Sequence, residues 1–245
     1  MTKAKAHSLA IDARHKLGLQ STEFVDVYRA ITILNIACVK RPLKSNISGA
    51  TFMVSEKAKI MLINSCNTLG HQNFTIAHEI YHCLYDESII NRTCKAEVFN
   101  RPRSSEDIAD LFAVYLLMPE DGIYRQLSLR QKLDKRPNLV DIVCLEQYFG
   151  VSRRAMCWRL EELKLISRSQ SEGYAQDVKQ SARVLGKDIK LYESTEERVL
   201  LSDYAEKAKE ALDKELITES RYHEILTDAG ILDEILAEES HSFAD

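Results

Sequence analysis

Two histidines four residues apart, with a glutamate directly after the first, occur in the stretch HEIYH at residues 78–82. On a helix, residues i and i+4 lie on the same face, with Cβ atoms about 5–6 Å apart. His78 and His82 could therefore bind one metal ion between their ring nitrogens, and imidazole is a common zinc ligand. Glu79 would lie about 100° around the helix from His78, beside such an ion, where a general base for water is needed. The pattern predicts a hydrolytic zinc site.

The alternative is a helix that carries three polar residues and binds no metal. With seven histidines in 245 residues, a chance H-E-x-x-H is expected in about one such chain in fifty. A third ligand separates the two interpretations, because a catalytic zinc takes three protein ligands and leaves a fourth position for water. The scheme H-E-x-x-H-x-x-G-x-x-H is excluded, because its glycine and third histidine positions hold Tyr85 and Ser88.

A third ligand is available in the later stretch SEDIAD. Glu106 lies 24 residues after His82, which leaves room for a loop and a returning helix. Asp110 lies one turn further along the same helix face, where it could accept the outer N–H of a histidine ligand. A Glu-x-x-x-Asp helix after H-E-x-x-H is the gluzincin arrangement. We therefore predict zinc ligands at His78, His82 and Glu106, a supporting carboxylate at Asp110, and Glu79 as the catalytic residue.

The elements that position these residues are mostly helical by hydrophobic periodicity. The helix with both histidines could be capped by Asn73 or Thr75, and the next helix by Ser104 in a capping box with Asp107. Two later helices joined by FGVS resemble a helix-turn-helix. Helices are predicted at residues 3–16 and 22–36, through FTIAHEIYHCLYD, from Ser104 to Pro119, and at 139–149 and 152–164.

Strands are predicted at only one place. Residues 47–54 and 59–65 are short and rich in β-forming residues, which predicts a hairpin. Its edge could receive an extended substrate segment beside the metal. Residues 87–103 have no clear period and are expected to form a loop, and the polar residues 167–183 a linker. The predicted fold class is α+β, predominantly helical, with one small sheet.

Composition limits the class of protein. Hydrophobic residues make up 45% and charged residues 29% of the chain, which is typical of a soluble globular protein. No apolar run reaches the roughly 18–20 residues of a membrane span. The N-terminus lacks the apolar stretch of a secretory signal, which predicts a cytoplasmic protein. Six scattered cysteines without a C-x-x-C pair predict reduced, mostly buried thiols.

The net charge of −4 is unevenly distributed. Residues 193–245 contain 5 Lys/Arg and 16 Asp/Glu, a balance of −11, whereas the remainder contains 28 and 21, a balance of +7. This distribution is unlike the concentrated basic face of a strong nucleic-acid binder. The acidic region also contains two apolar helical series. It therefore either folds onto the body or docks on a basic surface of a partner.

Three stretches of the chain resemble the ImmA/IrrE family of metallopeptidases, over roughly residues 20–168. FTIAHEIYH is similar to the family's FTLAHELGH, EDIADLFAVYLLMP to its E-x-x-A-[ND]-x-F-A-x-x-L-L-M-P helix, and FGVSRRAMCWRLEELKLI to its module with a G-V-S turn. The resemblance implies a zincin-like core, zinc ligands at His78, His82 and Glu106, and Glu79 as catalytic acid/base. It also implies a substrate class, the helix-turn-helix repressors of mobile elements or stress regulons.

Two positions depart from the family pattern. Tyr81 stands where the family has a small residue, so either the packing against this helix differs or the ring points outward. Asn73 stands where a basic residue is common. Tyr85, Tyr115 and His71, like Tyr81, could each stabilise an oxyanion, but a tyrosine on a half-buried helix usually just packs. We assign none of them this role.

Four segments are predicted along the chain. They are a zincin-like core at residues 1–125, a helix-turn-helix-like module at 126–168, a linker at 169–192 and an acidic helical region at 193–245. The predicted function is a zinc endopeptidase of narrow specificity that cleaves a partner regulator. The alternative is a transcriptional regulator or partner-binding protein that retains the metallopeptidase fold without catalysis.

Direct DNA binding through residues 139–164 is the alternative role for this module. The second helix of this module carries four basic residues, but it also carries two glutamates. Glu146 occupies a position where DNA-binding motifs commonly need a small residue against the recognition helix. A scaffold or a protein-docking role is favoured over the reading of bases.

Overall fold

The structure, a computed structural model, describes residues 2–53, 59–86, 92–95, 107–130 and 136–228. It is mostly helical with one small mixed sheet, which confirms the α+β class predicted from the sequence. In chain order the elements are α1 (Thr2–Lys16), α2 (Val27–Ile33), β1 (Ile36–Arg41), β2 (Ile47–Met53), β3 (Lys59–Asn64), α3 (Leu69–Tyr85), β4 (Arg92–Lys95), α4 (Asp107–Leu117), α5 (Glu120–Leu129), α6 (Leu139–Phe149), α7 (Arg153–Glu162), α8 (Arg168–Tyr174), α9 (Val178–Val184), the 3₁₀ turn η1 (Lys190–Tyr192), β5 (Val199–Leu201), α10 (Tyr204–Asp213) and α11 (Glu219–Asp228).

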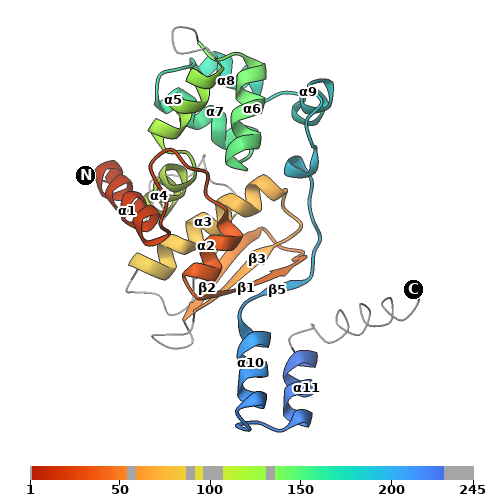
Figure 1. Cartoon of the computed structure of the whole chain (residues 1–245). Coiled ribbons are helices and arrows are strands. Elements are labelled where there is room, and N and C mark those ends of the chain that lie inside the picture. Colours follow the sequence, from red (N-terminus) through yellow and green to blue (C-terminus); the bar gives the residue numbers. More distant parts are fainter. Residues whose placement is uncertain (1, 54–58, 87–91, 96–106, 131–135, 229–245) are drawn as a thin grey trace.

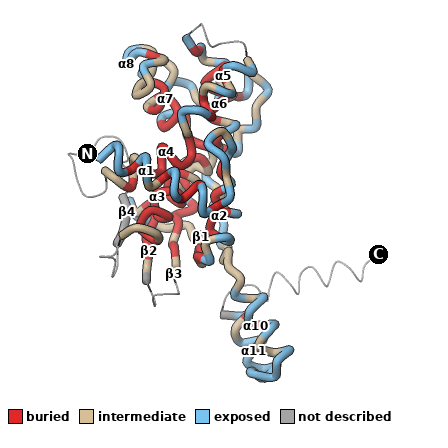
Figure 2. Tube along the Cα trace, turned by 60° about the vertical axis from the view of Figure 1, so that its left-hand side comes forward, coloured by how far each residue is buried: buried red, intermediate tan, exposed pale blue. Residues whose placement is uncertain are grey.

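Helices cover one face of the sheet (Figure 1). α3 packs on β2 and β3, α4 packs on α3, and α1 packs on α4. Twelve of the 17 residues of α3 are buried, so the helix that carries both histidines is the centre of the core. Buried residues concentrate where α3, α4 and the sheet meet (Figure 2). Three of the cysteines, Cys38, Cys83 and Cys157, are buried as free thiols.

Among the residues that the structure describes, the sheet has five strands in the order β4-β2-β3-β1-β5. β2 and β3 pair antiparallel, with Gly49 opposite Ile63, which confirms the predicted hairpin. β1 runs parallel to β3, while β4 and β5 pair antiparallel with β2 and β1. Both hairpin strands are therefore internal, and the prediction that the hairpin supplies the edge strand is wrong. The edges of these five strands are β4, which lies in the stretch 87–103 that was wrongly expected to be only a loop, and β5. Both short segments find partners far along the chain that no local pattern reveals.

Only part of the helix predicted at residues 22–36 forms. α2 starts after Asp26, whose side chain accepts hydrogen bonds from the backbone N–H groups of Tyr28 and Arg29 at 2.9 and 3.2 Å. It ends before Asn35, whose φ of 53° is incompatible with a continuing helix. The next residues form β1, in which buried and half-buried side chains alternate. The largely apolar run ITILNIACV is compatible with a helix or a strand. Its second half forms a strand because it pairs with β3.

α3 begins at Leu69, ahead of the predicted caps at Asn73 or Thr75. The residue before it makes no side-chain capping hydrogen bond. Instead, the backbone N–H of Leu69 donates to the carbonyl of Glu193 at 2.9 Å. Gly70 approaches the α6–α7 turn so closely that an added Cβ would lie 2.8 Å from a backbone nitrogen there. Tertiary contacts, and not a local cap, therefore fix the start of this helix.

α6 and α7 form as predicted, joined through Gly150, whose φ of 63° favours glycine. Glu146 on α6 is fully buried and accepts hydrogen bonds from Arg153 Nε and Nη2 at 2.5 and 2.8 Å. The Tyr192 hydroxyl donates to the same carboxylate at 2.5 Å. The glutamate that is unusual for a helix-turn-helix is thus held in a buried ion pair, and loss of either partner would leave an uncompensated charge.

The polar residues expected to be a linker at 167–183 contain two short helices, α8 and α9. Ser167 caps α8 in a capping box. Arg153 extends from α7 to this segment and donates to Tyr174 O and Ser181 Oγ at 2.9 and 3.1 Å. The segment is therefore fastened to the module by the same buried arginine that binds Glu146, a contact that the polar composition did not reveal.

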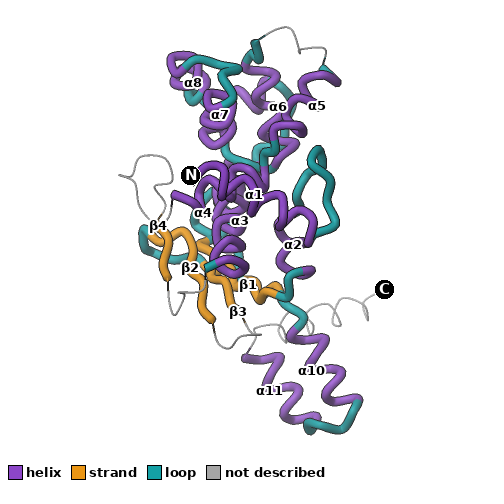
Figure 3. Tube along the Cα trace, turned by 90° about the vertical axis from the view of Figure 1, so that its left-hand side faces the viewer, coloured by secondary structure: helices purple, strands orange, loops and turns teal. Residues whose placement is uncertain are grey.

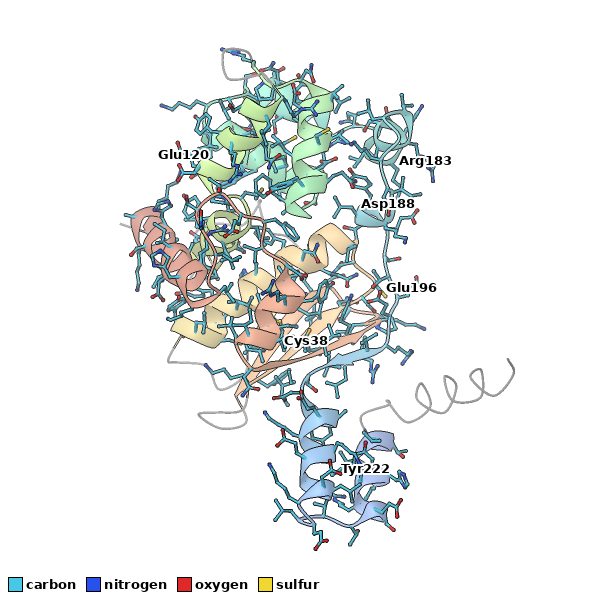
Figure 4. All side chains as sticks on the ribbon, in the orientation of Figure 1. Cys38, Glu120, Arg183, Asp188, Glu196 and Tyr222 are labelled. Carbon is cyan, nitrogen blue, oxygen red and sulfur yellow. The ribbon has the colours of Figure 1, made fainter. Side chains whose placement is uncertain are left out.

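The acidic region begins with a strand, where the sequence predicted only helix. β5 adds to the edge of the sheet, with Leu201 opposite Cys38. The extended segment that leads to it, with Asp188 and Glu196, runs along one side of the body (Figure 4). Beyond β5, α10 and α11 form a hairpin that extends from the body at the end opposite α5–α8 (Figure 3). No helix among the described residues is long and apolar enough to cross a membrane.

Candidate metal centre

His78 and His82 lie one turn apart on α3, and their rings face each other. Their Nε2 atoms are 3.1 Å apart, and their ring centroids are 5.0 Å apart. The side chain of His78 is 6% exposed and that of His82 is fully buried. The i, i+4 spacing read from the sequence therefore does place both imidazoles at one point in the interior.

Each histidine has a carboxylate at its other ring nitrogen. His78 Nδ1 lies 2.7 Å from Oδ1 of Asp110, which comes from α4. His82 Nδ1 lies 3.1 Å from Oδ2 of Asp86, at the end of α3. A carboxylate in this position accepts a hydrogen bond from Nδ1–H and leaves the lone pair of Nε2 available for another partner.

This arrangement fits a metal ion between the rings. Two Nε2 atoms that both carry lone pairs repel each other at 3.1 Å unless a cation or a proton lies between them. Zinc–nitrogen distances of about 2.0–2.1 Å in tetrahedral geometry put two histidine nitrogens about 3.3 Å apart. The separation and the burial of the two rings therefore fit a zinc ion between them.

The third predicted ligand, Glu106, lies outside the described residues. The next residue, Asp107, begins α4, and Asp110 on the same helix reaches the His78 ring. Within the described part of the chain, no group of three or more His, Cys, Asp or Glu side chains is arranged to hold a metal ion. The structure does bring His78 close to His82 and to Asp110. The ligand role of Glu106 stays a prediction.

Glu79, the residue after His78, is fully buried, and its two carboxylate oxygens differ in their hydrogen bonding. Oε2 accepts a hydrogen bond from Thr51 Oγ1 at 2.7 Å. Oε1 is buried and has no hydrogen-bond partner among the described residues. Gly49 keeps the space next to it open, because an added Cβ would lie 3.0 Å from Oε1 and 2.6 Å from Thr75 Cγ2. One carboxylate oxygen is thus anchored by Thr51, and the other accepts no hydrogen bond from the described residues.

Sequence reasoning missed both Thr51 and Asp86. Gly49 and Thr51 lie two residues apart on β2, so they share the face that meets α3. A small residue and a hydroxyl at this spacing in the hairpin were a usable signal, but only the packing of β2 on α3 pairs them with Glu79. Asp86 follows His82 at the helical spacing of four and could have been found by extending the search along the histidine face.

Tyr81, the bulky departure from the family pattern, points inward. Its side chain is 7% exposed, and its ring centroid lies 5.3 Å from that of His82 and 5.6 Å from that of Phe112. The ring therefore does not point outward, and the packing of α4 on α3 accommodates it. Asn73, the second departure, donates from Nδ2 to the carbonyl of Gly150 at 2.8 Å and ties α3 to the helix-turn-helix-like module.

The other oxyanion candidates are engaged in structural hydrogen bonds. The Tyr85 hydroxyl donates to Asp12 at 2.6 Å. Burial, and to a smaller extent this hydrogen bond, raises the pKa of Tyr85 above its ordinary value. The Tyr115 hydroxyl donates to Glu162 at 2.8 Å. His71 Nε2 lies 2.9 Å from a serine hydroxyl on β2, and burial lowers its pKa. These contacts are those of packing residues and give no reason to assign a catalytic role.

Comparison with protein families places this geometry in a known context. A model of the peptidase M78 family, described as an IrrE N-terminal-like domain, matches residues 33–161. The match runs from the end of α2 into α7, covers more than half of the chain, and includes the histidine pair, Glu79, Glu106 and Asp110. No curated protein matches the chain. The match confirms the resemblance seen in the motifs: the chain belongs to the peptidase M78 family of metallopeptidases, with an IrrE N-terminal-like domain.

Proposed function

We propose that the protein is a zinc-dependent endopeptidase of narrow specificity that cleaves a partner protein. The observation that carries the proposal is the pair of facing Nε2 atoms of His78 and His82, each ring held at its other nitrogen by a carboxylate. Glu79, one residue after His78, supplies a buried carboxylate with one oxygen available. Membership of a metallopeptidase family supports the same chemistry.

His78, His82 and Glu106 would hold the zinc ion. When bound, zinc would activate a water molecule and polarise the scissile carbonyl. Glu79 accepts the proton of the attacking water at Oε1, because Oε2 is already engaged by Thr51. The same carboxyl then delivers this proton to the leaving amine, so the residue acts first as a base and then as an acid.

The proposed substrate is a helix-turn-helix repressor, the class that the family resemblance implies. Its cleaved segment would bind in extended form along the outer edge of β4, the edge strand on the catalytic side of the sheet. β4 pairs with β2, with Arg92 opposite Thr51, so this edge strand is directly next to the strand that carries the residue anchoring Glu79. Backbone pairing would hold the segment, and contacts elsewhere would select the partner.

Incubation of the zinc-loaded protein with the proteins encoded beside its own gene is expected to give one discrete cleavage, in a helix-turn-helix repressor. A chelator should abolish the reaction, and added zinc should restore it, because His78, His82 and Glu106 act only through the metal. Gel electrophoresis and mass spectrometry of the fragments measure both. A partner that is bound tightly but stays intact would instead support the alternative, a regulator that retains the metallopeptidase fold without catalysis.

The packing of α7 weighs against a direct DNA-binding role for that alternative. Arg153 and Arg159 are 2% and 3% exposed. Arg153 pairs with Glu146, and Arg159 pairs with Glu162 at 2.6 Å. Two of the four basic residues at 152–164 are thus used inside the protein and have no reach to phosphates or bases. A scaffold role for the module is the better supported proposal.

The α10–α11 hairpin is the proposed recognition element for the partner. Residues 203–228 contain 8 acidic and 4 basic residues. Each of the four basic residues forms an ion pair within the hairpin, so the remaining charge is negative. The pairs are Lys207–Asp203, Lys209–Asp213, Lys214–Glu210 and Arg221–Glu224. Such a surface attracts the basic DNA-binding face of a repressor. The two helices pack mainly on each other and leave most of their residues exposed (Figure 2).

A protein that ends at Ser202 is expected to bind zinc normally but to cleave its partner weakly. The full-length reaction should also slow as salt rises, because salt screens the attraction between exposed charges. Cleavage rates of both forms across a salt series are the measurement. Full-length protein with Glu206, Glu215 and Glu219 changed to Gln is the control that removes charge but keeps the helices. Full activity of the shortened protein, without salt dependence in either form, would contradict the proposal.

The position of this cut matters. A cut at Ser194, where the acidic region starts, would remove β5 from the sheet and Glu197 from Lys40. Lys40 Nζ lies 2.5 Å from Glu197 Oε2, and its side chain is 3% exposed. Burial opposes the charge of Lys40, but the bonds to Glu197 and Tyr28 outweigh it and raise its pKa. Without Glu197 a buried charge would lose its partner, and the experiment would test folding and not recognition.

A further inference from the structure

Asp86 directly follows α3 and approaches a histidine of the metal centre. Its Oδ2 lies 3.1 Å from Nδ1 of His82, one helical turn back along the chain. The His82 side chain is fully buried and that of Asp86 is 14% exposed. The contact therefore forms at the wall of the core, where solvent screens it only weakly.

A carboxylate at this position is not explained by helix capping. The last carbonyl groups of a helix carry partial negative charge, so an acidic side chain there opposes the helix dipole. The backbone N–H of Asp86 already satisfies the carbonyl of His82, at 3.4 Å, without using the side chain. The side chain of Asp86 points at an imidazole, a contact that helix capping does not explain.

We infer that Asp86 is a positioning residue of the metal centre. It accepts the Nδ1–H of His82, which fixes the ring orientation and keeps the proton away from Nε2, the nitrogen that faces His78. The inference rests on the proposed zinc site and extends it beyond the predicted ligands and Asp110.

The two histidines would then be held in different ways. Asp110 reaches His78 from α4, so that contact exists only when α4 is packed on α3. Asp86 is on the same chain segment as His82, so that contact is made between α3 and the residue directly after it. His82 would be oriented as soon as α3 forms, before the third predicted ligand arrives with the α4 segment. Such pre-orientation raises metal affinity because less ordering remains for the binding step.

The test is the zinc dissociation constant of the full chain, measured by competition with a chromophoric chelator. Asp86→Ala is expected to weaken zinc binding by about 10–100-fold, the usual effect of removing a carboxylate behind a histidine ligand. Asp86→Asn should recover part of the loss, because the amide oxygen still accepts Nδ1–H. Asp12→Ala is the matched control: Asp12 accepts the Tyr85 hydroxyl at 2.6 Å, at the same end of α3, and does not touch His82. Its zinc affinity should equal that of the wild type.

A second measurement uses the metal-free protein. Nitrogen NMR of the imidazoles should find His82 in the Nδ1–H form in the wild type and in Asp86→Asn, and a mixture of tautomers in Asp86→Ala. A merely structural role for Asp86 would lower the thermal midpoint without changing this signature. If Asp86→Ala does not fold, the affinity and tautomer of Asp86→Asn still decide the matter, because that variant keeps size and acceptor.

Wild-type zinc affinity in Asp86→Ala, with zinc lost in His82→Ala, would overturn the role of Asp86 and leave the proposed metal centre intact. Equal losses in Asp86→Ala and Asp12→Ala would also overturn it, because the effect would then belong to the end of α3 in general. Zinc retained in His82→Ala would instead refute the metal centre itself.

Discussion

Replacement of Glu79 by Gln is expected to leave the zinc content unchanged and to slow cleavage of the partner by about 10²–10⁴-fold, the usual contribution of general acid–base catalysis. Gln has the size of Glu, and its amide oxygen can still accept the hydrogen bond that Thr51 now donates at 2.7 Å. It has no carboxylate to take a proton from water or return one to the leaving amine. The geometry would survive while the base is lost.

Metal analysis and single-turnover cleavage of the zinc-loaded protein measure the two quantities separately. Glu162→Gln is a suitable control, because Glu162 is a half-buried carboxylate bonded to Tyr115 and Arg159, away from the histidine pair. It should cleave at the wild-type rate. A Glu79→Gln protein that cleaves as fast as the wild type would mean that another group moves the proton.

Replacement of Glu106 by Ala is expected to remove most of the zinc. A catalytic zinc takes three protein ligands, and this change would leave only His78 and His82. Asp110→Ala should have a smaller effect, about 10–100-fold in affinity, because it keeps all three ligands and removes only the acceptor at His78 Nδ1.

Zinc per chain after dialysis, followed by chelator competition, distinguishes the two changes. The order of the effects is the informative result, since both residues belong to one short stretch of sequence. Full zinc in Glu106→Ala together with complete loss in Asp110→Ala would reverse the assignment. Asp110 would then be the third ligand and not the residue that orients His78.

The sequence by itself determined the parts of this protein that depend on local geometry. The facing of His78 and His82 follows from helical spacing alone, because residues i and i+4 share a face in any helix. The β2–β3 hairpin and the α6–α7 pair were predicted for the same reason, since their partners are adjacent in the chain. The family followed from short motifs with fixed spacing, and the match over residues 33–161 confirmed it.

Only the tertiary structure decided which strands form the edges of the sheet. β1 lies in an apolar run that suited a helix, and pairing with β3 made it a strand. β5 pairs with β1 across some 160 residues of chain, with Leu201 opposite Cys38. A three-residue strand has too little pattern of its own to be recognised, because its hydrogen bonds are all made with a distant segment.

The polar contacts around the site also came from the tertiary structure. Thr51 reaches Glu79 because β2 packs under α3 in one register, which no spacing between residues 51 and 79 reveals. Glu146 stands where helix-turn-helix motifs commonly have a small residue, and the structure accommodates it because Arg153 and Tyr192 donate hydrogen bonds to its carboxylate. Helical spacing brings groups together through the fixed geometry of one element. These contacts depend instead on how separate elements pack, which the sequence pattern does not show. Burial makes them necessary, because an unpaired charge in the interior is costly.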